Sequence, residues 1–503
     1  FSAEVGGGAY AFVPGNGAIA GDVFYEVTET DFATPRVGDE AYLTIIHEIG
    51  HAIGLGHGHE ADGISPALPA AVDSNEFSVM TYRNFIGSDP GNPSQAETFG
   101  YPQTFMTLDI AALQYMYGAN YNTNAGDTTY GFNPTTGAFS INGQLVSTPG
   151  DNVVFRTIWD GNGTDTYDFS GYGNGVTVDL TPGGHSTLSA DQVPQLNAAA
   201  GDQPARGSLW NALLHNNDAR ALIENATTGN GNDNITGNQA DNQLIGGAGN
   251  DTMAGADGND RLFGGDGDDQ ALGGNGDDIV FGGNGNDNLA AGTGNDQVYG
   301  GAGNDGVAAG AGNDTLGGST GNDSLFGATG QDLVIGGADS DAVYGGADND
   351  KVFGSAGDDT AAGGTGDDEI GAGAGNDQVA AGGGADTIYG GAGNDTLFAA
   401  AGADSVFGGA GDDQIYLGNA DGARDIVLST MTNGSDTVFG FENGTDLLNT
   451  TASGLTDFAA VQGRLGQDAA GNATIDLGNG DMLTLSGVTQ AQIDASDFQF
   501  AGA

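Results

Sequence analysis

Two patterns of hydrophobic positions divide the chain. Between residues 228 and 416, a larger apolar residue recurs at every ninth position and follows a stretch rich in glycine. This spacing predicts short strands, each with one side chain directed into a narrow core, and a tight turn between consecutive strands. Two nine-residue units would complete one coil, and strands of neighbouring coils would stack in parallel ~4.8 Å apart. Outside this region the apolar positions follow helical or alternating spacings.

Helical spacing is clearest in the stretch that follows Asp39. Four apolar residues recur there on one side of the predicted helix: Leu43, Ile46, Ile49 and Ile53. Asp39 is a suitable N-cap, and Gly54 can adopt the left-handed conformation that ends a helix. We therefore expect a helix between these two residues, with one side toward the core. Residues 107–118 predict a second, amphipathic helix that ends in glycine.

Short β-strands are predicted on both sides of these helices. Residues 9–13 and 22–27 are apolar stretches bounded by turn residues, and they precede the first helix. Residues 153–155 and 166–169 predict strands in the region between the second helix and the repeats. Residues 436–441 predict another strand after the repeats, in a β-rich segment that ends with the acidic and aromatic residues 494–500.

The nine-residue unit reads G-G-x-G-x-D-x-U-x, where U is the larger apolar residue. There are 21 consecutive units without an insertion, and the sixth position is Asp in all but one, where Asn242 replaces it. Carboxylates and the exposed carbonyls of glycine-rich turns are the hard oxygen ligands that calcium prefers. The unit is typical of the calcium-binding β-roll of RTX proteins. The predicted calcium ligands are Asp233, Asp251, Asp260, Asp269, Asp278, Asp287, Asp296, Asp305, Asp314, Asp323, Asp332, Asp341, Asp350, Asp359, Asp368, Asp377, Asp386, Asp395, Asp404 and Asp413.

The charge of the repeats is consistent with many bound cations. Residues 228–416 contain 31 acidic and two basic residues, a net charge of −29. If a calcium ion lies between each turn and the next turn on the same side, 21 turns offer up to 19 sites, which would more than cancel that charge. Without calcium the repulsion should keep the tract disordered, as expected for an acidic, glycine-rich sequence. Asp339 and Asp348 replace a glycine in two units, but aspartate tolerates positive φ better than most residues.

Residues 47–57 read H-E-x-x-H-x-x-G-x-x-H, with His47, His51 and His57 as candidate zinc ligands. The first two are four residues apart, so they share one face of a helix. Gly54 lets the chain turn and bring the third histidine to the same ion. Three histidines leave one coordination position for water, which is typical of catalytic zinc, and Glu48 is placed to act as general base. The alternative, a helix with buried histidines that bind nothing, is a poor explanation of five matched positions.

Composition excludes several classes of partner. The net charge is −58 with only nine Lys and Arg residues, which argues against nucleic acid and anionic membranes. The absence of cysteine excludes disulfides and thiolate zinc sites. No apolar stretch approaches the ~18 residues of a membrane-spanning helix. A high content of carboxylates suits divalent cations instead.

Beyond the zinc motif, residues 77–82 (F-S-V-M-T-Y) resemble the Met-turn of the metzincins. The resemblance implies that Met80 lies beneath the zinc-binding histidines. It also implies that Tyr82 ligates zinc at rest and moves to stabilise the transition state. Residues 22–27 would be the edge strand that pairs with the substrate backbone. His59 lies outside the motif, and we interpret it as a solvent-exposed loop residue.

Together, the chain resembles the serralysins, which are secreted bacterial metzincins with a C-terminal RTX β-roll. Three further stretches carry the likeness: residues 109–120 (D-I-A-A-L-Q-Y-M-Y-G-A-N), residues 130–133 (Y-G-F-N) and residues 159–171, which begin W-D-G-N-G-T-D. Only 46 residues precede His47, fewer than the family carries, so we expect an N-terminally incomplete α+β metzincin domain followed by an all-β parallel roll.

The expected domains are a catalytic region (1–120), a β-rich connecting segment (121–227), the RTX roll (228–416) and a β-rich C-terminal segment with a type I secretion signal (417–503). The resemblance implies a secreted, monomeric zinc endopeptidase that is stabilised by calcium. Its partners would be protein or peptide substrates and, transiently, a type I exporter. The alternative is an extracellular calcium-binding RTX structural protein that is truncated or has lost catalysis. An RTX lipase is disfavoured because no G-x-S-x-G motif accompanies a fitting triad, and an RTX adhesin would not need the zinc motif.

Overall fold

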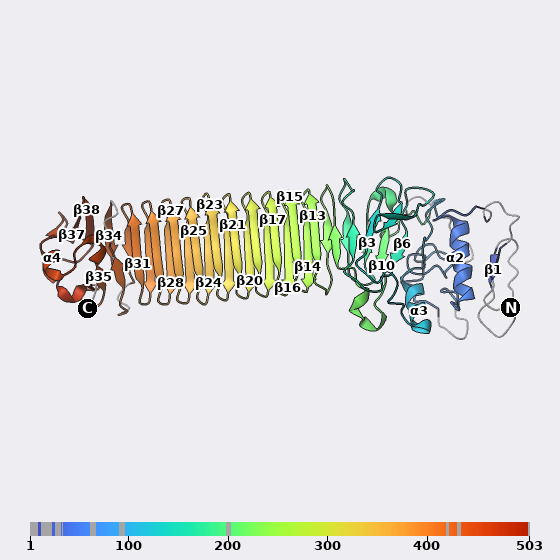
Figure 1. Cartoon of the computed structure of the whole chain (residues 1–503), viewed down its shortest axis with the longest axis horizontal. Coiled ribbons are helices and arrows are strands. Elements are labelled where there is room, and N and C mark those ends of the chain that lie inside the picture. Colours follow the sequence, from blue (N-terminus) through green and yellow to red (C-terminus); the bar gives the residue numbers. More distant parts are fainter. Residues whose placement is uncertain are drawn as a thin grey trace. The chain divides into compact units, whose positions relative to one another are not determined.

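The computed structural model describes residues 9–11, 23–25, 32, 34–60, 67–89, 96–197, 203–418, 422–429 and 434–500. The chain forms two compact units, Phe1–Asp257 and Gly258–Ala503, which are called unit 1 and unit 2 below (Figure 1). No helix in the described part of the chain is long and apolar enough to cross a membrane.

Two α-helices of unit 1 lie where the sequence predicts them. Helix α2 (Glu40–Ala52) begins after Asp39, whose carboxylate accepts a 2.7 Å hydrogen bond from the N–H of Tyr42. The helix ends before Gly54, which adopts a φ of 105°. Helix α3 (Thr107–Tyr117) ends at Gly118, with a φ of 80°. The predicted N-cap and both glycine termini are therefore confirmed.

The core of unit 1 packs beneath helix α2. Seven of its larger buried side chains are Leu55, Val79, Met80, Met106, Phe155, Leu196 and Trp210. Leu43 and Ile46 pack against this cluster, as expected. Ile49 was expected on the same face but is 39% exposed, so that assignment is wrong. His47 and Gly50 are buried instead, because the helix turns its 43–46–47–50 side toward Met80.

The strands of unit 1 are short. Two pair antiparallel: β1 (Ala9–Ala11) and β2 (Val23–Tyr25). One mixed sheet contains β6 (Arg156–Ile158), β10 (Leu209–Asn211) and β9 (His185–Ser186). A second contains β5 (Gln144–Ser147), β4 (Phe139–Ile141), β3 (Thr129–Phe132), β7 (Thr166–Asp168), β11 (Asn225–Thr227) and β13 (Gln243–Ala248). The third contains β8 (Thr177–Asp179), β12 (Asn234–Thr236) and β14 (Thr252–Asp257).

Most predicted strands of unit 1 are present in shortened form. Residues 12–13, 22 and 26–27, which the sequence also assigns to these strands, lie outside the described residues. Residues 153–155 are buried without forming a strand, and strand β6 begins directly after them. Periodicity placed this strand three residues early because a continuous apolar stretch does not mark where pairing begins.

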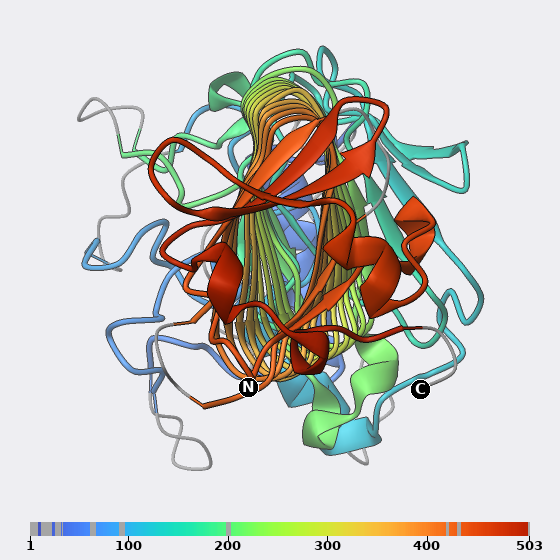
Figure 2. The same cartoon turned by 90° about the vertical axis from the view of Figure 1, so that its left-hand side faces the viewer.

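Unit 2 is a parallel β-roll made of two facing sheets, which Figure 2 shows end-on in yellow and orange. One sheet contains β15 (Arg261–Asp266), β17 (Ile279–Asn284), β19 (Gln297–Ala302), β21 (Thr315–Thr320), β23 (Leu333–Ala338), β25 (Lys351–Ala356), β27 (Glu369–Ala374), β29 (Thr387–Ala392), β31 (Ser405–Ala410), β33 (Ile426–Leu428) and β35 (Leu447–Asn449). The other contains β16 (Gln270–Asn275), β18 (Asn288–Thr293), β20 (Gly306–Ala311), β22 (Ser324–Thr329), β24 (Ala342–Ala347), β26 (Thr360–Thr365), β28 (Gln378–Gly383), β30 (Thr396–Ala401), β32 (Gln414–Tyr416), β34 (Ser435–Phe439), β38 (Asp481–Leu485), β37 (Ala473–Gly478) and β36 (Leu465–Gln467).

The register of the roll confirms the two-unit coil. Strands of each sheet pair residues that are 18 positions apart, for example Leu262 with Val280. The eighth residue of every unit in unit 2 is at most 4% exposed, even where it is only alanine, as at Ala271 and Ala361. Most strands are six residues long, because each covers the three residues centred on U and the G-G-x that follows them.

The roll continues beyond the last nine-residue unit. Strands β33 and β35 extend one sheet in parallel, and β34 and β38 extend the other. Strands β36 and β37 then turn antiparallel, and the short helix α4 (Phe458–Gln462) precedes them. The sequence predicts a separate β-rich segment here, and the structure shows that part of it belongs to the roll.

Candidate metal centre

The three histidines of the predicted motif come together in unit 1. His47 and His51 project from helix α2 one turn apart, and His57 comes from the loop after Gly54. One ring nitrogen of each lies within 4.8 Å of the corresponding atoms of the other two. The Nε2 atoms of His51 and His57 are 2.9 Å apart. Such convergence of three imidazoles matches the donor set of a zinc site.

Backbone carbonyls orient two of the rings. Nδ1 of His47 donates to the carbonyl of Val79 at 2.7 Å, and Nδ1 of His51 donates to the carbonyl of Leu55 at 2.8 Å. These bonds leave each Nε2 with its lone pair free to bind a metal. Nε2 of His47 is buried and has no hydrogen-bond partner. An unpartnered, buried nitrogen that faces two further imidazoles fits a bound cation.

Burial keeps two of these histidines neutral. It lowers the pKa of His47 to about 3 and that of His57 to about 4, and the neighbouring imidazoles add to both shifts. A metal binds the neutral imidazole, so both rings are in the required form at neutral pH.

The segment below the histidines is fixed by a buried carboxylate. Asp109 of α3 accepts hydrogen bonds from Oγ of Ser78 at 2.6 Å and from the N–H of Val79 at 2.7 Å. Met80 follows and is 2% exposed. A Cβ at Gly50 would lie 2.4 Å from Sδ of Met80, so the methionine packs directly against helix α2 beneath the histidines. This is the position that the resemblance implies for Met80.

Two further groups border the cluster. The hydroxyl of Tyr82 lies 2.9 Å from Nε2 of His57. Burial and the charge of Glu48 raise the pKa of Tyr82, so the phenol stays protonated. Burial also raises the pKa of Glu48. The charge of His51 and a backbone hydrogen bond from Ala11 partly offset this increase.

His59 does not lie where the sequence interpretation placed it. Its side chain is 5% exposed, and its ring centroid is 4.6 Å from that of Tyr82 and 5.3 Å from that of His57. The interpretation as a solvent-exposed residue is wrong, because the loop folds back over the cluster. His59 does not join the group of three converging nitrogens.

In unit 2, the aspartates of the repeats form two ladders. The N–H of Asp278 donates to Oδ1 of Asp296, and the N–H of Asp296 donates to Oδ1 of Asp314, both at 2.8 Å. The second oxygen, Oδ2, is buried and lacks a hydrogen-bond partner in Asp287, Asp296, Asp305, Asp314, Asp323, Asp332, Asp341, Asp350, Asp359, Asp368, Asp377, Asp386, Asp395 and Asp413. Buried carboxylate oxygens without donors are costly unless a cation binds them.

The pKa values of the ladder aspartates also favour a bound cation. Burial, together with the neighbouring carboxylates, raises the pKa of Asp296 to about 6 and those of Asp341 and Asp350 to about 7. Most units have glycine opposite the carboxylate, where a Cβ on Gly282 would lie 2.2 Å from Oδ2 of Asp287, whereas alanine occupies the equivalent position at Ala291 and Ala309. The ligand set therefore fits calcium.

Sequence reasoning missed a third acidic group, in unit 1. The N–H of Asp165 donates to Oε2 of Glu224 at 2.7 Å, and Asp160 accepts from the hydroxyl of Tyr130. Oδ2 of Asp165 is buried without a partner, and burial raises its pKa and that of Glu224. The sequence signal was weak: two aspartates in a glycine-rich stretch and a glutamate 59 residues away.

Comparisons with known proteins agree with these features. The family profile described as Peptidase M10 serralysin C terminal matches residues 119–192, and that of the RTX calcium-binding nonapeptide repeat matches seven segments between residues 227 and 421, some of which overlap. The chain is a serralysin-like protein with RTX repeats. Its fold comprises a parallel β-roll and a unit compatible with a partial metzincin domain, as expected.

Curated relatives of the serralysin-like chain include three enzymes. Serralysin C of Dickeya chrysanthemi is 36% identical over 232 residues, 45% of this chain and 42% of the relative. Metallopeptidase AprA of Pseudomonas marginalis is 34% identical over 233 residues, which is 44% of this chain and 48% of the relative. Serralysin of Proteus mirabilis is 36% identical over 226 residues, which is 42% of this chain and 43% of the relative. The matched part of the chain thus spans somewhat under half the length of these relatives.

The solved structures that match include the crystal structure of a hyperactive, Ca2+-dependent, β-helical antifreeze protein from an Antarctic bacterium. The two sequences are 22% identical, the match covers 65% of this chain and 84% of the antifreeze protein chain, and the TM-score is 0.26.

Proposed function

We propose that the chain is part of a secreted zinc endopeptidase that calcium stabilises. The observation that carries this proposal is the convergence of His47, His51 and His57, with an unpartnered Nε2 on the first, beside Glu48 and Tyr82. The names of the curated relatives support a protease, and the repeats support a calcium requirement.

Each residue of the cluster has a separate role in the proposed hydrolysis. His47, His51 and His57 would hold zinc, with Tyr82 as a fourth ligand at rest. When bound, zinc supplies a Lewis acid that activates water and polarises the scissile carbonyl. Glu48 accepts a proton from the attacking water and passes it to the leaving amine. The hydroxyl of Tyr82 donates a hydrogen bond to the oxyanion.

The remaining roles also follow from the family resemblance. Calcium would bind the aspartate ladders outside the cell, where it is abundant, and would fold the roll after export. A type I exporter would carry the unfolded chain, and the folded protein would act on protein or peptide substrates as a monomer. The four domain ranges given under Sequence analysis stay predictions.

The test compares two glutamates of helix α2. Glu48→Gln in the calcium-loaded chain should retain one zinc per chain by elemental analysis but lose casein hydrolysis by about 10²–10⁴-fold. Glu40→Gln, at an exposed position in the first turn, should leave both unchanged. Full activity of Glu48→Gln would overturn the proposed chemistry. A chain that binds calcium but neither zinc nor substrate would instead be a structural RTX protein.

A further inference from the structure

One turn of the repeat region lacks the aspartate that the other turns share. It joins strand β12 to strand β13 in unit 1, and Asn242 occupies its sixth position. Asn238 replaces the glycine of the second position, and Ala240 replaces that of the fourth. The sequence of this turn therefore departs from the repeat at three of the positions that shape a calcium-binding turn.

The backbone of this turn differs as well. In a regular unit the second and fourth residues have a positive φ, for example 124° at Gly283 and 128° at Gly285. None of residues 237–242, all of which the structure describes, has a φ in the left-handed region. Because the left-handed positions shape the regular turn, the carbonyls of residues 237–242 do not take the same arrangement.

Two amide side chains close the turn. Oδ1 of Asn242 accepts a 2.7 Å hydrogen bond from the N–H of Asn238, and its Nδ2 donates to the carbonyl of Glu224 at 2.8 Å. Nδ2 of Asn238 donates to the carbonyls of Leu180 and Ile223, at 3.1 and 2.8 Å. Both asparagines are 2% exposed. Three backbone carbonyls thus obtain a neutral N–H donor and need no cation.

The aspartate turns lack such donors. At Asp233, in the preceding unit, and at Asp287, the Oδ2 atom is buried without a hydrogen-bond partner. No side-chain atom of Asn238 or Asn242 is left in that condition. A buried carboxylate oxygen without a donor is costly unless a cation binds it, whereas a buried amide with its bonds made is not. The turn at Asn242 is therefore complete without an ion.

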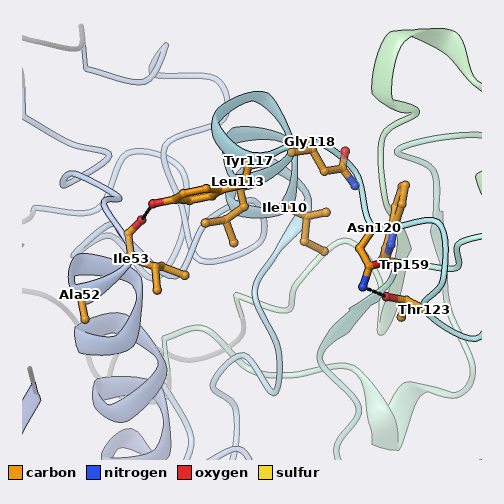
Figure 3. Close-up of a pocket in the computed structure, with 10 residues that line it drawn as sticks. Ala52, Ile53, Ile110, Leu113, Tyr117, Gly118, Asn120, Thr123 and Trp159 are labelled. Atoms are coloured by element: carbon orange, nitrogen blue, oxygen red, sulfur yellow. Dashed lines mark hydrogen bonds between the residues drawn. The ribbon is translucent and has the colours of Figure 1, made fainter. Parts of the chain in front are cut away.

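Uncharged groups also join this turn to the rest of unit 1. Strand β13 pairs in parallel with β11, and β11 pairs with β7. Ahead of β7, the N–H of Gly161 donates to the carbonyl of Thr123, whose hydroxyl accepts from Nδ2 of Asn120. Helix α3 ends just before Asn120, and the hydroxyl of Tyr117 bonds it to the carbonyl of Ile53 at 2.6 Å (Figure 3). Contacts that need no cation therefore connect helix α2 with this turn.

We propose that residues 237–242 form an ion-free lock of the repeat region: this turn stays closed in the absence of calcium, whereas the aspartate turns of unit 2 open. The amide groups of Asn238 and Asn242 replace the ion that the other turns require. The lock holds the start of strand β13 against unit 1 before the aspartate ladders have bound calcium. This inference depends neither on zinc nor on the proposed proteolysis.

Hydrogen exchange detected by mass spectrometry tests the lock in the full chain while a chelator lowers free calcium stepwise. Peptides that cover residues 237–245 should keep their protection throughout. Peptides that cover residues 278–314 should come to exchange about as fast as an unfolded chain, because their turns depend on calcium. Loss of protection at residues 237–245 together with residues 278–314 overturns the proposal.

A variant separates the amide lock from ordinary packing. Asn242→Asp has nearly the same shape, but it replaces the Nδ2 donor with an oxygen that faces the carbonyl of Glu224. At low calcium, residues 237–245 of this variant should exchange about ten- to a hundredfold faster than in the wild-type chain, because a buried acceptor loses its donor. If the variant does not fold, the exchange pattern of the wild-type chain decides the question.

Asn232→Asp is the matched control, since it adds the same charge to the neighbouring unit. Asn232 is exposed, and its Oδ1 accepts from the N–H of Asn250, a bond that aspartate also makes. Exchange of residues 237–245 should stay at the wild-type rate in this variant. Equal acceleration in Asn232→Asp and Asn242→Asp would assign the effect to charge and overturn the role of the amides.

Discussion

The backbone N–H of Asp296 donates a 2.8 Å hydrogen bond to Oδ1 of Asp314, eighteen residues further along the chain. The same bond recurs along both sides of the roll and fixes one oxygen of each carboxylate. Oδ2 of Asp314 is left buried and unpaired. Oδ1 of the aspartate thus stabilises the roll through the hydrogen bond, whereas Oδ2 is available to calcium. The two roles can therefore be separated experimentally.

Asp314→Asn should weaken calcium-dependent folding without breaking the ladder. Asparagine keeps an oxygen for the N–H of Asp296 but replaces the charged Oδ2 with a neutral group. We expect the calcium-loaded roll to lose about 2 kcal/mol, the order of one charge-assisted contact. Calcium titrations followed by circular dichroism should show a higher midpoint.

Asp277→Asn is the matched control. Asp277 is exposed and accepts from the N–H of Asn295 through Oδ1, a bond that asparagine also makes. Its calcium midpoint should stay close to that of the wild-type chain. Equal midpoint shifts in both variants would mean that total charge, rather than the buried Oδ2, governs calcium binding.

In chelator, the roll should be less stable at pH 8 than at pH 5. Folding raises the pKa of Asp296 to about 6 and that of Asp341 to about 7, from the ordinary 3.8. The folded roll therefore binds more protons than the unfolded chain between about pH 4 and 7, and its stability falls as pH rises through that window. The β-sheet circular dichroism signal that remains in chelator at the two pH values measures this, because it reports the folded fraction. Calcium must reverse the trend, because it binds the ionised carboxylates; a roll that is more stable at pH 8 in chelator contradicts the prediction.

Much of the roll could be predicted because its period is strict. A nine-residue repeat with a buried eighth position determines register and coil size together. The strand predicted at residues 436–441 is present as β34, but the continuation of the roll after Tyr416 could not be predicted, since the spacing changes: Asp404 bonds to Asp425 after 21 residues, and Asp413 bonds to Asp436 after 23. The ladder continues there while the sequence period does not.

The candidate zinc site was predictable for a related reason. The motif places two histidines by helix geometry and the third by a glycine turn, so few conformations satisfy it. His59 and Glu224 were misjudged or missed, because their positions depend on how loops pack rather than on local spacing. Ile49 shows the same limit, since hydrophobic spacing cannot tell which of two helix faces the core covers.

Gly50→Ala should destabilise unit 1. The new methyl group would lie 2.4 Å from Sδ of Met80, and overpacking of about 1–3 kcal/mol outweighs the gain in helix propensity. Urea unfolding followed by tryptophan fluorescence reports on unit 1, which contains both Trp159 and Trp210.

The double variant Gly50→Ala, Met80→Ala supplies the control. If the contact with Met80 causes the loss, the alanine at position 50 should cost little once the methionine side chain is removed, which gives a clear coupling energy. Additive losses would assign the effect to the helix backbone instead.

Asp39→Ala should shorten helix α2 from its N-terminal end. The carboxylate accepts from the N–H groups of Tyr42 and Arg36, both at 2.7 Å, and losing a cap of this kind costs about 1 kcal/mol. Asp39→Asn retains an acceptor and should lose only a fraction of this, measured by the same fluorescence-detected unfolding. Zinc content should not change in either variant, because the first ligand, His47, lies two turns into the helix. A loss of zinc in Asp39→Ala but not in Asp39→Asn would show that the cap positions the histidines as well as stabilising the helix.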